Sequence, residues 1–244
     1  MLNELNPQVK ALLERFQADA ARHPGPATPL SQKEKIMATR EMITVVIHGR
    51  DEARASAVAR EIRDQGGRAS VVLGDLSCDA GADAVASGAL KDGQVDILVN
   101  NAAAYHHLGW METNAKVWTE TYQVNVISAV RLIQQLVPLM KKNKWGRVIQ
   151  IGGGLAIQPI PMQPDYNASL AARHNLAVSL ARELKESGVT SNAIAPGAIL
   201  VDSVEQLLRE IAPKFKWGSA WEDIEKGAVR GCLKSLIQGR SGLA

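Results

Sequence analysis

The sequence predicts an α/β fold in which helices cover both faces of a parallel β-sheet. Short apolar runs of strand length alternate with longer segments whose apolar residues recur at helical spacing, and this alternation is typical of a doubly wound sheet. The segment 96–100 is centred on an uninterrupted apolar run, as expected of a strand that is buried on both faces. Glycines and prolines lie at the junctions between segments, where the chain must turn.

Residues 1–42 are expected to form a helical N-terminal segment and a linker. Asn6 and Pro7 suit the N-cap and first position of a helix. The stretch 23–30 contains three prolines and a glycine, which indicates a linker. Ser-Gln-Lys-Glu at 31–34 matches a capping box that starts a second short helix. The strand and helix alternation begins at residue 43, so residues 43–244 are predicted to form the main domain.

The elements of the main domain follow from the period of the apolar residues. Strands are expected at 43–47, 70–73, 96–100, 148–151 and 192–195. Helices are expected at 51–65, 79–90, 114–142, 164–187, 205–211 and 221–237, and the third of these is expected to bend near Pro138. Glycines stop the first helix at Gly66 and the fourth at Gly188.

Composition and charge exclude several classes of function. The chain has 244 residues, enough for one α/β domain with a core. The net charge of +3 is too small, and the basic residues too scattered, to predict a nucleic-acid partner. The two cysteines show no metal-ligand spacing, and no apolar run is long enough to span a membrane. The N-terminus lacks a signal-peptide core, so we expect a cytoplasmic protein. Because the cysteines lack metal-ligand spacing, we expect no bound metal.

Three motifs occur in a fixed order between residues 100 and 197. They are Asn-Asn-Ala-Ala at 100–103, Tyr-Asn-Ala-Ser at 166–169 near the start of a long helix, and Asn-Ala-Ile-Ala-Pro-Gly at 192–197. From about residue 43 to about residue 224 the chain resembles the short-chain dehydrogenase/reductase family. The resemblance implies a Rossmann-like doubly wound parallel sheet and oxidoreduction of a small carbonyl or alcohol with NADP. It also implies a homo-oligomer, either a dimer or a tetramer.

The resemblance assigns roles to individual residues. Tyr166 matches the catalytic acid/base, and Asn125 matches the helix asparagine whose backbone holds a water in the family's proton relay. For the cofactor, Arg50 matches a 2′-phosphate ligand and Asp75 the acceptor of the adenine amine. The residues near the ribose and the nicotinamide match Asn100, Ala102, Pro196 and Gly197.

The chain departs from the family where the chemistry occurs. Residues 1–42 contain no glycine-rich turn to receive a pyrophosphate. Gly153 stands at the position of the family's serine, and Leu170 at that of its lysine. An unperturbed tyrosine has a pKa of about 10, so only about one molecule in a thousand is ionised at pH 7. Without the lysine ammonium to lower that pKa, the oxidoreductase activity is expected to be weak at best.

The missing turn also affects the expected sheet. The family's first strand and helix and its C-terminal strand have no counterparts in this sequence. Neighbouring strands lie about 4.8 Å apart, and a missing central strand leaves backbone groups unpaired. We therefore expect the strand at 43–47 to pair directly with the strand at 96–100.

Two residues offer substitutes for the missing groups. Arg173 lies two helical turns after Tyr166, about 10.5 Å along the axis, and helical side chains lean toward the N-terminus. Its charge is therefore expected to replace part of the lysine's field. His106 follows the strand at 96–100, beside His107, and is a candidate base.

Two other functions stay open. A small-ester esterase, hence a hydrolase, would use Tyr166, His106 and the glycines at 152–154. Asn-Pro-Gln-Val-Lys-Ala-Leu-Leu-Glu-Arg at 6–15 also resembles the first cap helix of hormone-sensitive-lipase-like esterases. However, the sequence has no Gly-x-Ser-x-Gly motif, and Ser169 is expected to pack within its helix. The third alternative is a non-catalytic interaction protein that retains the fold.

Overall fold

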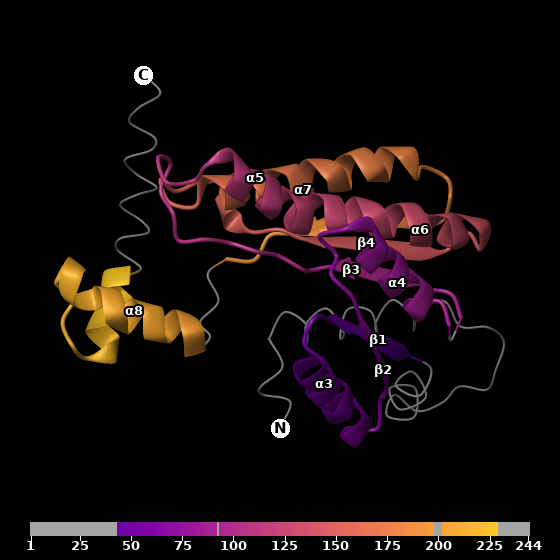
Figure 1. Cartoon of the computed structure of the whole chain (residues 1–244), viewed down its shortest axis with the longest axis horizontal. Helices are drawn as coiled ribbons and strands as arrows, with labels where there is room; N and C mark the ends of the chain where they lie inside the picture. Colours follow the sequence, from indigo (N-terminus) through magenta and orange to yellow (C-terminus); the bar gives the residue numbers. More distant parts are fainter. Residues whose placement is uncertain (1–42, 92, 198–201, 229–244) are drawn as a thin grey trace. The chain divides into compact units, whose positions relative to one another are not determined.

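The computed structural model describes residues 43–91, 93–197 and 202–228 (Figure 1). The chain divides into two compact units, one of Met1–Asp75 with Asp83–Ala89 and one of Leu76–Ala82 with Leu90–Ala244. The helices predicted within residues 1–42 lie outside the described residues, and so does the end of the chain after residue 228. The boundary predicted at residue 43 stays a prediction.

The first unit contains a two-stranded parallel sheet. Strand β1 (Thr44–Gly49) pairs with β2 (Arg68–Leu73), and Thr44 lies beside Arg68. The connecting helix α3 (Glu52–Asp64) begins at Asp51, whose carboxylate accepts a hydrogen bond from the backbone N–H of Arg54 at 3.0 Å. The unit also holds most of α4 (Asp79–Ala89). Both predicted strands and both predicted helices of this region are therefore confirmed within about two residues.

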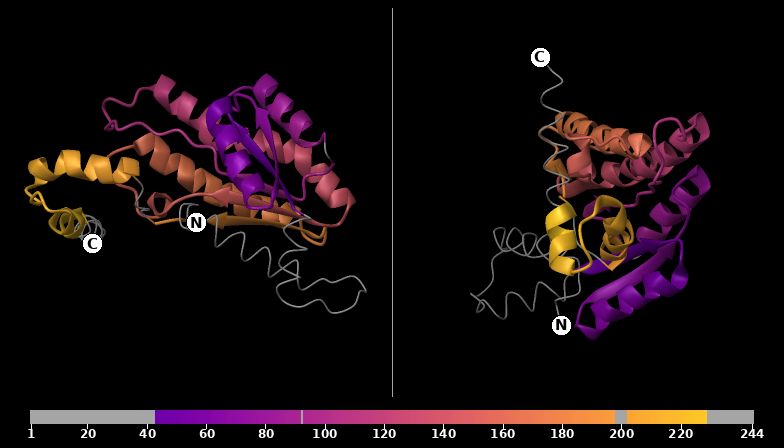
Figure 2. Two further views of the ribbon diagram at one scale, coloured as in Figure 1. Left: turned by 90° about the horizontal axis from the view of Figure 1, so that it is seen from below. Right: turned by 90° about the vertical axis from the view of Figure 1, so that its left-hand side faces the viewer.

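The second unit contains a three-stranded parallel sheet in the order β3-β4-β5. The strands are β3 (Ile97–Asn100), β4 (Gly146–Ile151) and β5 (Val189–Ile194), and β5 begins three residues before the predicted strand. Helix α6 (Ser128–Lys142) contacts β3 and β4, while α7 (Pro164–Glu183) contacts β4 and β5. Figures 1 and 2 show these two helices side by side over the sheet.

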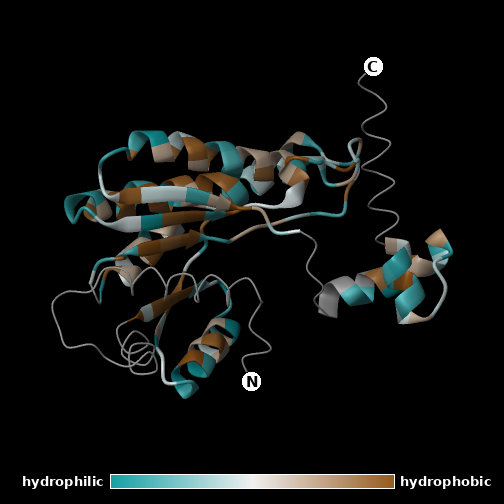
Figure 3. Cartoon of the chain, turned by 180° about the vertical axis from the view of Figure 1, so that it is seen from behind, coloured by the Kyte–Doolittle hydropathy of each residue, from teal (hydrophilic) through white to brown (hydrophobic). Residues whose placement is uncertain are grey.

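The core of the second unit lies between this sheet and the two helices. Val148 of the central strand is fully buried, and Leu136 and Met140 of α6 and Ala177 of α7 are almost fully buried. Figure 3 shows the hydrophobic residues concentrated on the strands, whereas the helices carry both kinds of residue. Burial of these side chains supplies the main stabilisation of the unit.

The segment predicted as one helix at 114–142 forms three elements. Helix α5 (Ala115–Tyr122) runs into a π-helical turn, η1 (Gln123–Ile127), which continues into α6. The chain is thus helical from Ala115 to Lys142, as predicted, but the extra residue of a π turn changes the hydrogen-bond pattern within the segment. Pro138 lies inside α6, well after this interruption.

Helix α8 (Asp202–Phe215) is longer than the predicted 205–211, and a further helix occupies 221–228. The rest of the helix predicted at 221–237 lies outside the described residues. The two helices bury Ala212 and Ile224, which are 1% and 2% exposed. None of the described helices combines the length and apolarity needed to cross a bilayer.

The predicted pairing of the strands at 43–47 and 96–100 stays a prediction, because the two strands belong to different units. Within its own unit, β1 pairs with β2, and β3 pairs with β4. Each of these strands pairs with the strand that follows it across a helical crossover, which is the usual arrangement for a β-α-β connection.

Candidate functional site

The candidate site lies at the carboxyl ends of β3 and β4 in the second unit. The loop after β3, the glycines after β4 and the start of α7 meet there, and open α/β sheets hold ligands at this edge. Helix α7 begins after Gln163, whose backbone is left-handed with φ 58° and ψ 50°. The backbone N–H of Gln163 donates to the carbonyl of Leu108 at 2.8 Å, and its side-chain Nε2 lies 3.1 Å from Nδ1 of His107. These bonds fasten the β3 loop to the start of α7.

Asn125 holds the same loop from the other side. It lies in η1 and is fully buried. Its Oδ1 accepts from the backbone N–H of Ala104 at 2.7 Å, and its Nδ2 donates to the carbonyl of Ala104 and to Oγ of Ser169, both at 2.9 Å. The structure thus places Asn125 against the loop after β3 and against α7. Its part in a proton relay stays a prediction.

Arg173 is buried behind the site and joins its parts. The side chain is 1% exposed, and it donates to the carbonyls of Asn125, Ala102 and Ile151, the last at 2.6 Å. Burial lowers the pKa of Arg173 to about 10, an effect that the nearby Tyr166 opposes. The guanidinium is therefore still charged at neutral pH. As predicted, it reaches toward the carboxyl ends of the strands, and it is held there by three main-chain acceptors.

Tyr166 is half-buried in the first turn of α7. Burial raises the pKa of its phenol above the usual value, Arg173 lowers this pKa by a smaller amount, and Tyr105 raises it. The rings of Tyr105 and Tyr166 lie 5.7 Å apart between centroids. The field of Arg173 thus acts in the predicted direction, but burial outweighs it.

The two positions at which the chain departs from the family contact each other. Leu170 is 2% exposed, and a Cβ added to Gly153 would lie 3.1 Å from its Cδ1. The leucine side chain therefore packs against the backbone at the position where the family has its serine. The neighbouring Gly152 is required for another reason, since a Cβ there would lie 2.2 Å from Nε2 of His174.

The predicted cofactor residues fall in both units. In the second unit, Asn100 is buried and its Nδ2 has no partner among the described residues, while the carbonyl of Ala102 accepts from Arg173. The carbonyl of Pro196 accepts from the backbone N–H of Gly154 at 3.0 Å, and Gly197 is exposed. In the first unit, Arg50 follows β1 and Asp75 follows β2, and both are exposed. Their roles in cofactor binding stay predictions.

Sequence reasoning missed Asp165 and Thr121. Asp165 is the second residue of α7 and is fully buried. Its Oδ2 accepts a hydrogen bond from Oγ1 of Thr121 at 2.5 Å and lies 3.8 Å from Nδ1 of His106. An acidic residue in the first turn of a helix is ordinary, so no local signal marked this one as part of a buried cluster.

Ser169 packs within its helix, as predicted. It is fully buried, donates to the carbonyl of Tyr166 at 2.7 Å and accepts from Asn125. A hydroxyl held in this way cannot serve as a hydrolase nucleophile. The residues that resemble an esterase cap helix lie outside the described residues. Within the described ranges, no group of three or more His, Cys, Asp or Glu is placed to hold a metal ion.

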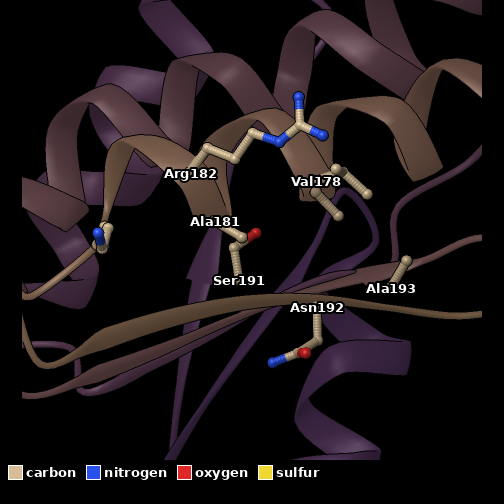
Figure 4. Close-up of a pocket in the computed structure, with 8 residues that line it drawn as sticks. Val178, Ala181, Arg182, Ser191, Asn192 and Ala193 are labelled. Carbon is tan, nitrogen blue, oxygen red and sulfur yellow. The ribbon is translucent and has the colours of Figure 1, made fainter.

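A groove of about 510 Å³ lies elsewhere on the second unit, between α7 and β5 (Figure 4). Val178, Ala181 and Arg182 line it from the helix, and Ser191, Asn192 and Ala193 from the strand. None of the predicted catalytic or cofactor residues lines this groove. The candidate site is therefore the edge around Tyr166 and not this groove.

Known proteins are similar to this chain in sequence and in fold. A 3-oxoacyl-[acyl-carrier-protein] reductase of Synechocystis sp. is 31% identical over 80% of this chain and 78% of its own length. The uncharacterized oxidoreductase YvaG of Bacillus subtilis is 30% identical, and the matched region spans 71% of this chain but only 65% of that relative.

A solved L-sorbose reductase from Gluconobacter frateurii, complexed with NADPH and L-sorbose, superposes with a TM-score of 0.69 at 30% identity. The superposition covers 76% of this chain and 71% of that one. The family model described as short chain dehydrogenase matches residues 35–212, which is most of the chain. This match confirms the resemblance that the motifs around Tyr166 indicated. The chain therefore belongs to the short-chain dehydrogenase family.

Proposed function

We propose that the chain is an NADP-linked oxidoreductase that interconverts a small carbonyl compound and its alcohol, with Tyr166 as the proton donor. The observation that carries this proposal is the position of Tyr166, half-buried at the carboxyl edge of the sheet and near the charged Arg173. The NADPH and L-sorbose complex of the similar Gluconobacter frateurii reductase supports it. An aromatic hydroxyl at this edge suits a general acid.

Each unit, taken by itself, offers one residue that suits part of NADP. Arg50 offers an exposed cation immediately after β1, suited to a 2′-phosphate. Beyond the end of β5, no atom of the described residues outside its chain neighbours lies within 4 Å of a Cβ added to Gly197, which leaves room for a ligand beside that backbone. The bound cofactor would supply the hydride. At the position of the family's ribose-binding lysine the fit is poor, because Leu170 presents only methyl groups. We therefore expect slow turnover.

The preference for NADP is expected to depend on Arg50. Replacing it by alanine should weaken NADPH binding about tenfold and leave NADH binding unchanged, because only NADPH carries the phosphate that a guanidinium binds in a forked geometry. Fluorescence titration of the full chain with each cofactor measures both affinities. Arg54→Ala is the matched control, since Arg54 is exposed and pairs with Asp51 at 3.6 Å. If the wild-type chain showed no saturable NADPH binding, the proposed function itself would fail.

The raised pKa of Tyr166 predicts how the rate depends on pH. Alcohol oxidation needs the phenolate as a base, and burial places its pKa above the usual value of 10. The oxidation rate should therefore rise about tenfold for each pH unit between pH 7 and pH 9.5, without a plateau. Carbonyl reduction needs the phenol, which stays protonated over this range, so Tyr166 adds no pH dependence there. Initial rates in both directions, with Tyr166→Phe as control, check this; a plateau near pH 8 contradicts it.

These assays distinguish the proposed oxidoreductase from a non-catalytic interaction protein. The latter would reduce none of a panel of carbonyl compounds with NADPH. No described contact favours the esterase alternative. The homo-oligomer implied by family resemblance stays a prediction, and sedimentation of the full chain tests it.

A further inference from the structure

Asp165 is a buried carboxylate with too few partners. It is fully buried, and among the described residues its carboxylate accepts one hydrogen bond, from the neutral hydroxyl Oγ1 of Thr121 at 2.5 Å. Its second oxygen, Oδ1, is buried and has no hydrogen-bond partner among the described residues. The first turn of α7 contributes partial positive charge. A carboxylate removed from water still requires a donor or a cation close by.

His106 is placed to provide that donor. Its Nδ1 lies 3.8 Å from Oδ2 of Asp165, is shielded from solvent and has no hydrogen-bond partner among the described residues. The side chain as a whole is 41% exposed, so its exposed area belongs to atoms other than Nδ1. One face of the imidazole thus meets a buried carboxylate while the rest of the ring meets solvent. A shift of about 1 Å brings Nδ1 within hydrogen-bond distance of Oδ2.

We propose that Asp165, held by Thr121, fixes His106 in the tautomer that carries its proton on Nδ1, so that Nε2 exchanges protons between solvent and the phenol of Tyr166. The tautomer follows from the carboxylate, because an imidazole donates from the nitrogen that faces an acceptor. His106 is then a catalytic residue, and Asp165 is a positioning residue. The catalytic part of this inference rests on the proposed function, whereas the tautomer does not.

Two residues near Tyr166, Arg173 and Leu170, do not fit this role. Arg173 is still protonated at neutral pH, and its N–H groups are engaged by three carbonyls, so it stabilises charge without passing a proton. Leu170 cannot carry a proton. His106, in contrast, follows Tyr105, whose ring contacts the ring of Tyr166, and faces Asp165, which precedes Tyr166 in the chain.

In the proposed reaction, protons pass from solvent through His106 and Tyr166 to the substrate. During carbonyl reduction the O–H bond of Tyr166 breaks, and its proton moves to the substrate oxygen. The phenolate then takes a proton from Nε2 of the doubly protonated His106, directly or through one water. The neutral ring, with its proton on Nδ1, accepts a new proton at Nε2 from solvent. Oxidation of the alcohol runs the same steps in reverse.

The tautomer is tested in the full chain without any ligand. Long-range ¹H–¹⁵N correlation spectra distinguish the two neutral tautomers of each of the five histidines, and the spectrum of His106→Gln assigns the signal. We expect the neutral ring of His106 to carry its proton on Nδ1, and Asp165→Ala to shift it to Nε2. Thr121→Val keeps the carboxylate and should preserve the wild-type tautomer. A neutral His106 protonated on Nε2 in the wild type overturns the inference, even if Asp165→Ala fails to fold.

The catalytic role is tested by NADPH oxidation with a carbonyl substrate. His106→Gln should lower kcat about 100-fold with KM and NADPH affinity unchanged, because only proton transfer is lost. Added imidazole should restore part of the rate of His106→Ala. Lys185→Gln is the control, since the side chain of Lys185 is 81% exposed and lies after the end of α7. An active wild type with an unaffected His106→Gln overturns this inference and leaves the proposed function intact. If the wild type shows no turnover, the proposed function fails and the spectra still decide the tautomer.

Discussion

Replacing Arg173 by methionine is expected to lower the free energy of unfolding by about 3 kcal/mol or more. Methionine keeps much of the buried length of the side chain but donates no hydrogen bond. The carbonyls of Ala102, Asn125 and Ile151 would each lose a charged donor. A buried acceptor left without a partner typically costs about 1 to 3 kcal/mol. Part of this loss is offset because the variant no longer buries a charge.

The effect should reach the site, because these carbonyls belong to three different elements. They lie after β3, in η1 and at the end of β4, and Arg173 is a common donor to all three. Without it, the loop that carries His106 loses one of its attachments. We therefore expect carbonyl reduction to fall more than tenfold even at temperatures at which the variant is folded.

Urea unfolding followed by circular dichroism measures the change in stability. Arg182→Met is the matched control, because Arg182 lies on the same helix and is exposed, so its replacement should change stability by less than about 0.5 kcal/mol. A loss of less than about 1 kcal/mol for Arg173→Met would show that the three hydrogen bonds contribute little in solution. If the activity and pH profile of the Arg173→Met variant equalled those of the wild type, Arg173 would have no role in catalysis.

Restoring the two groups that the chain lacks is expected to raise the rate of carbonyl reduction by about 100- to 1,000-fold. The double variant Gly153→Ser with Leu170→Lys supplies a hydroxyl for the substrate carbonyl and an ammonium near Tyr166. A single well-placed donor to a developing oxyanion is typically worth a factor of about 10² to 10³ in rate. The ammonium should also lower the pKa of Tyr166, since an opposite charge favours the phenolate.

The contact between the two positions predicts that neither single change will suffice. A Cβ at residue 153 would lie 3.1 Å from Cδ1 of Leu170, so a serine alone meets the leucine side chain. Replacing Leu170 by lysine removes that branched end and makes room for the hydroxyl. Residues in contact couple, and the gain of the double variant should therefore exceed the product of the single effects.

Steady-state kcat/KM for the wild type, both single variants and the double variant measures this coupling. Leu170→Met is the control, because it keeps an apolar side chain of similar volume and should give no gain. The pH profile of alcohol oxidation provides a second test, since a plateau should appear below pH 10 only when lysine is present. A folded double variant that binds NADPH and gains no activity would contradict the proposed reaction at Tyr166.

The spacing of apolar residues along the sequence predicted most of the helices and strands. Apolar runs and their periods identified β1, β3 and β4, because apolar and β-branched side chains fit the pleated surface of a sheet. The motif around Tyr166 identified the family. The π turn at η1 was not predicted, since the letters Gln-Val-Asn-Val-Ile at 123–127 are compatible with an ordinary helix. The pairing of β1 with the strand at 96–100 stays a prediction, because strand order depends on crossovers and not on strand composition.

The sequence by itself determined the order of strands and helices, the family, and the loss of the serine and lysine at positions 153 and 170. Only the tertiary structure decided that these two positions touch, that Asp165 is buried beside His106, and that Arg173 binds three carbonyls. The reason is separation along the chain. Thr121 and Asp165 are 44 residues apart, and Arg173 and Ala102 are 71 apart. The pattern of apolar side chains within one helix or strand indicates which of its faces is buried. The residues that this face contacts are determined by how the other elements pack against it.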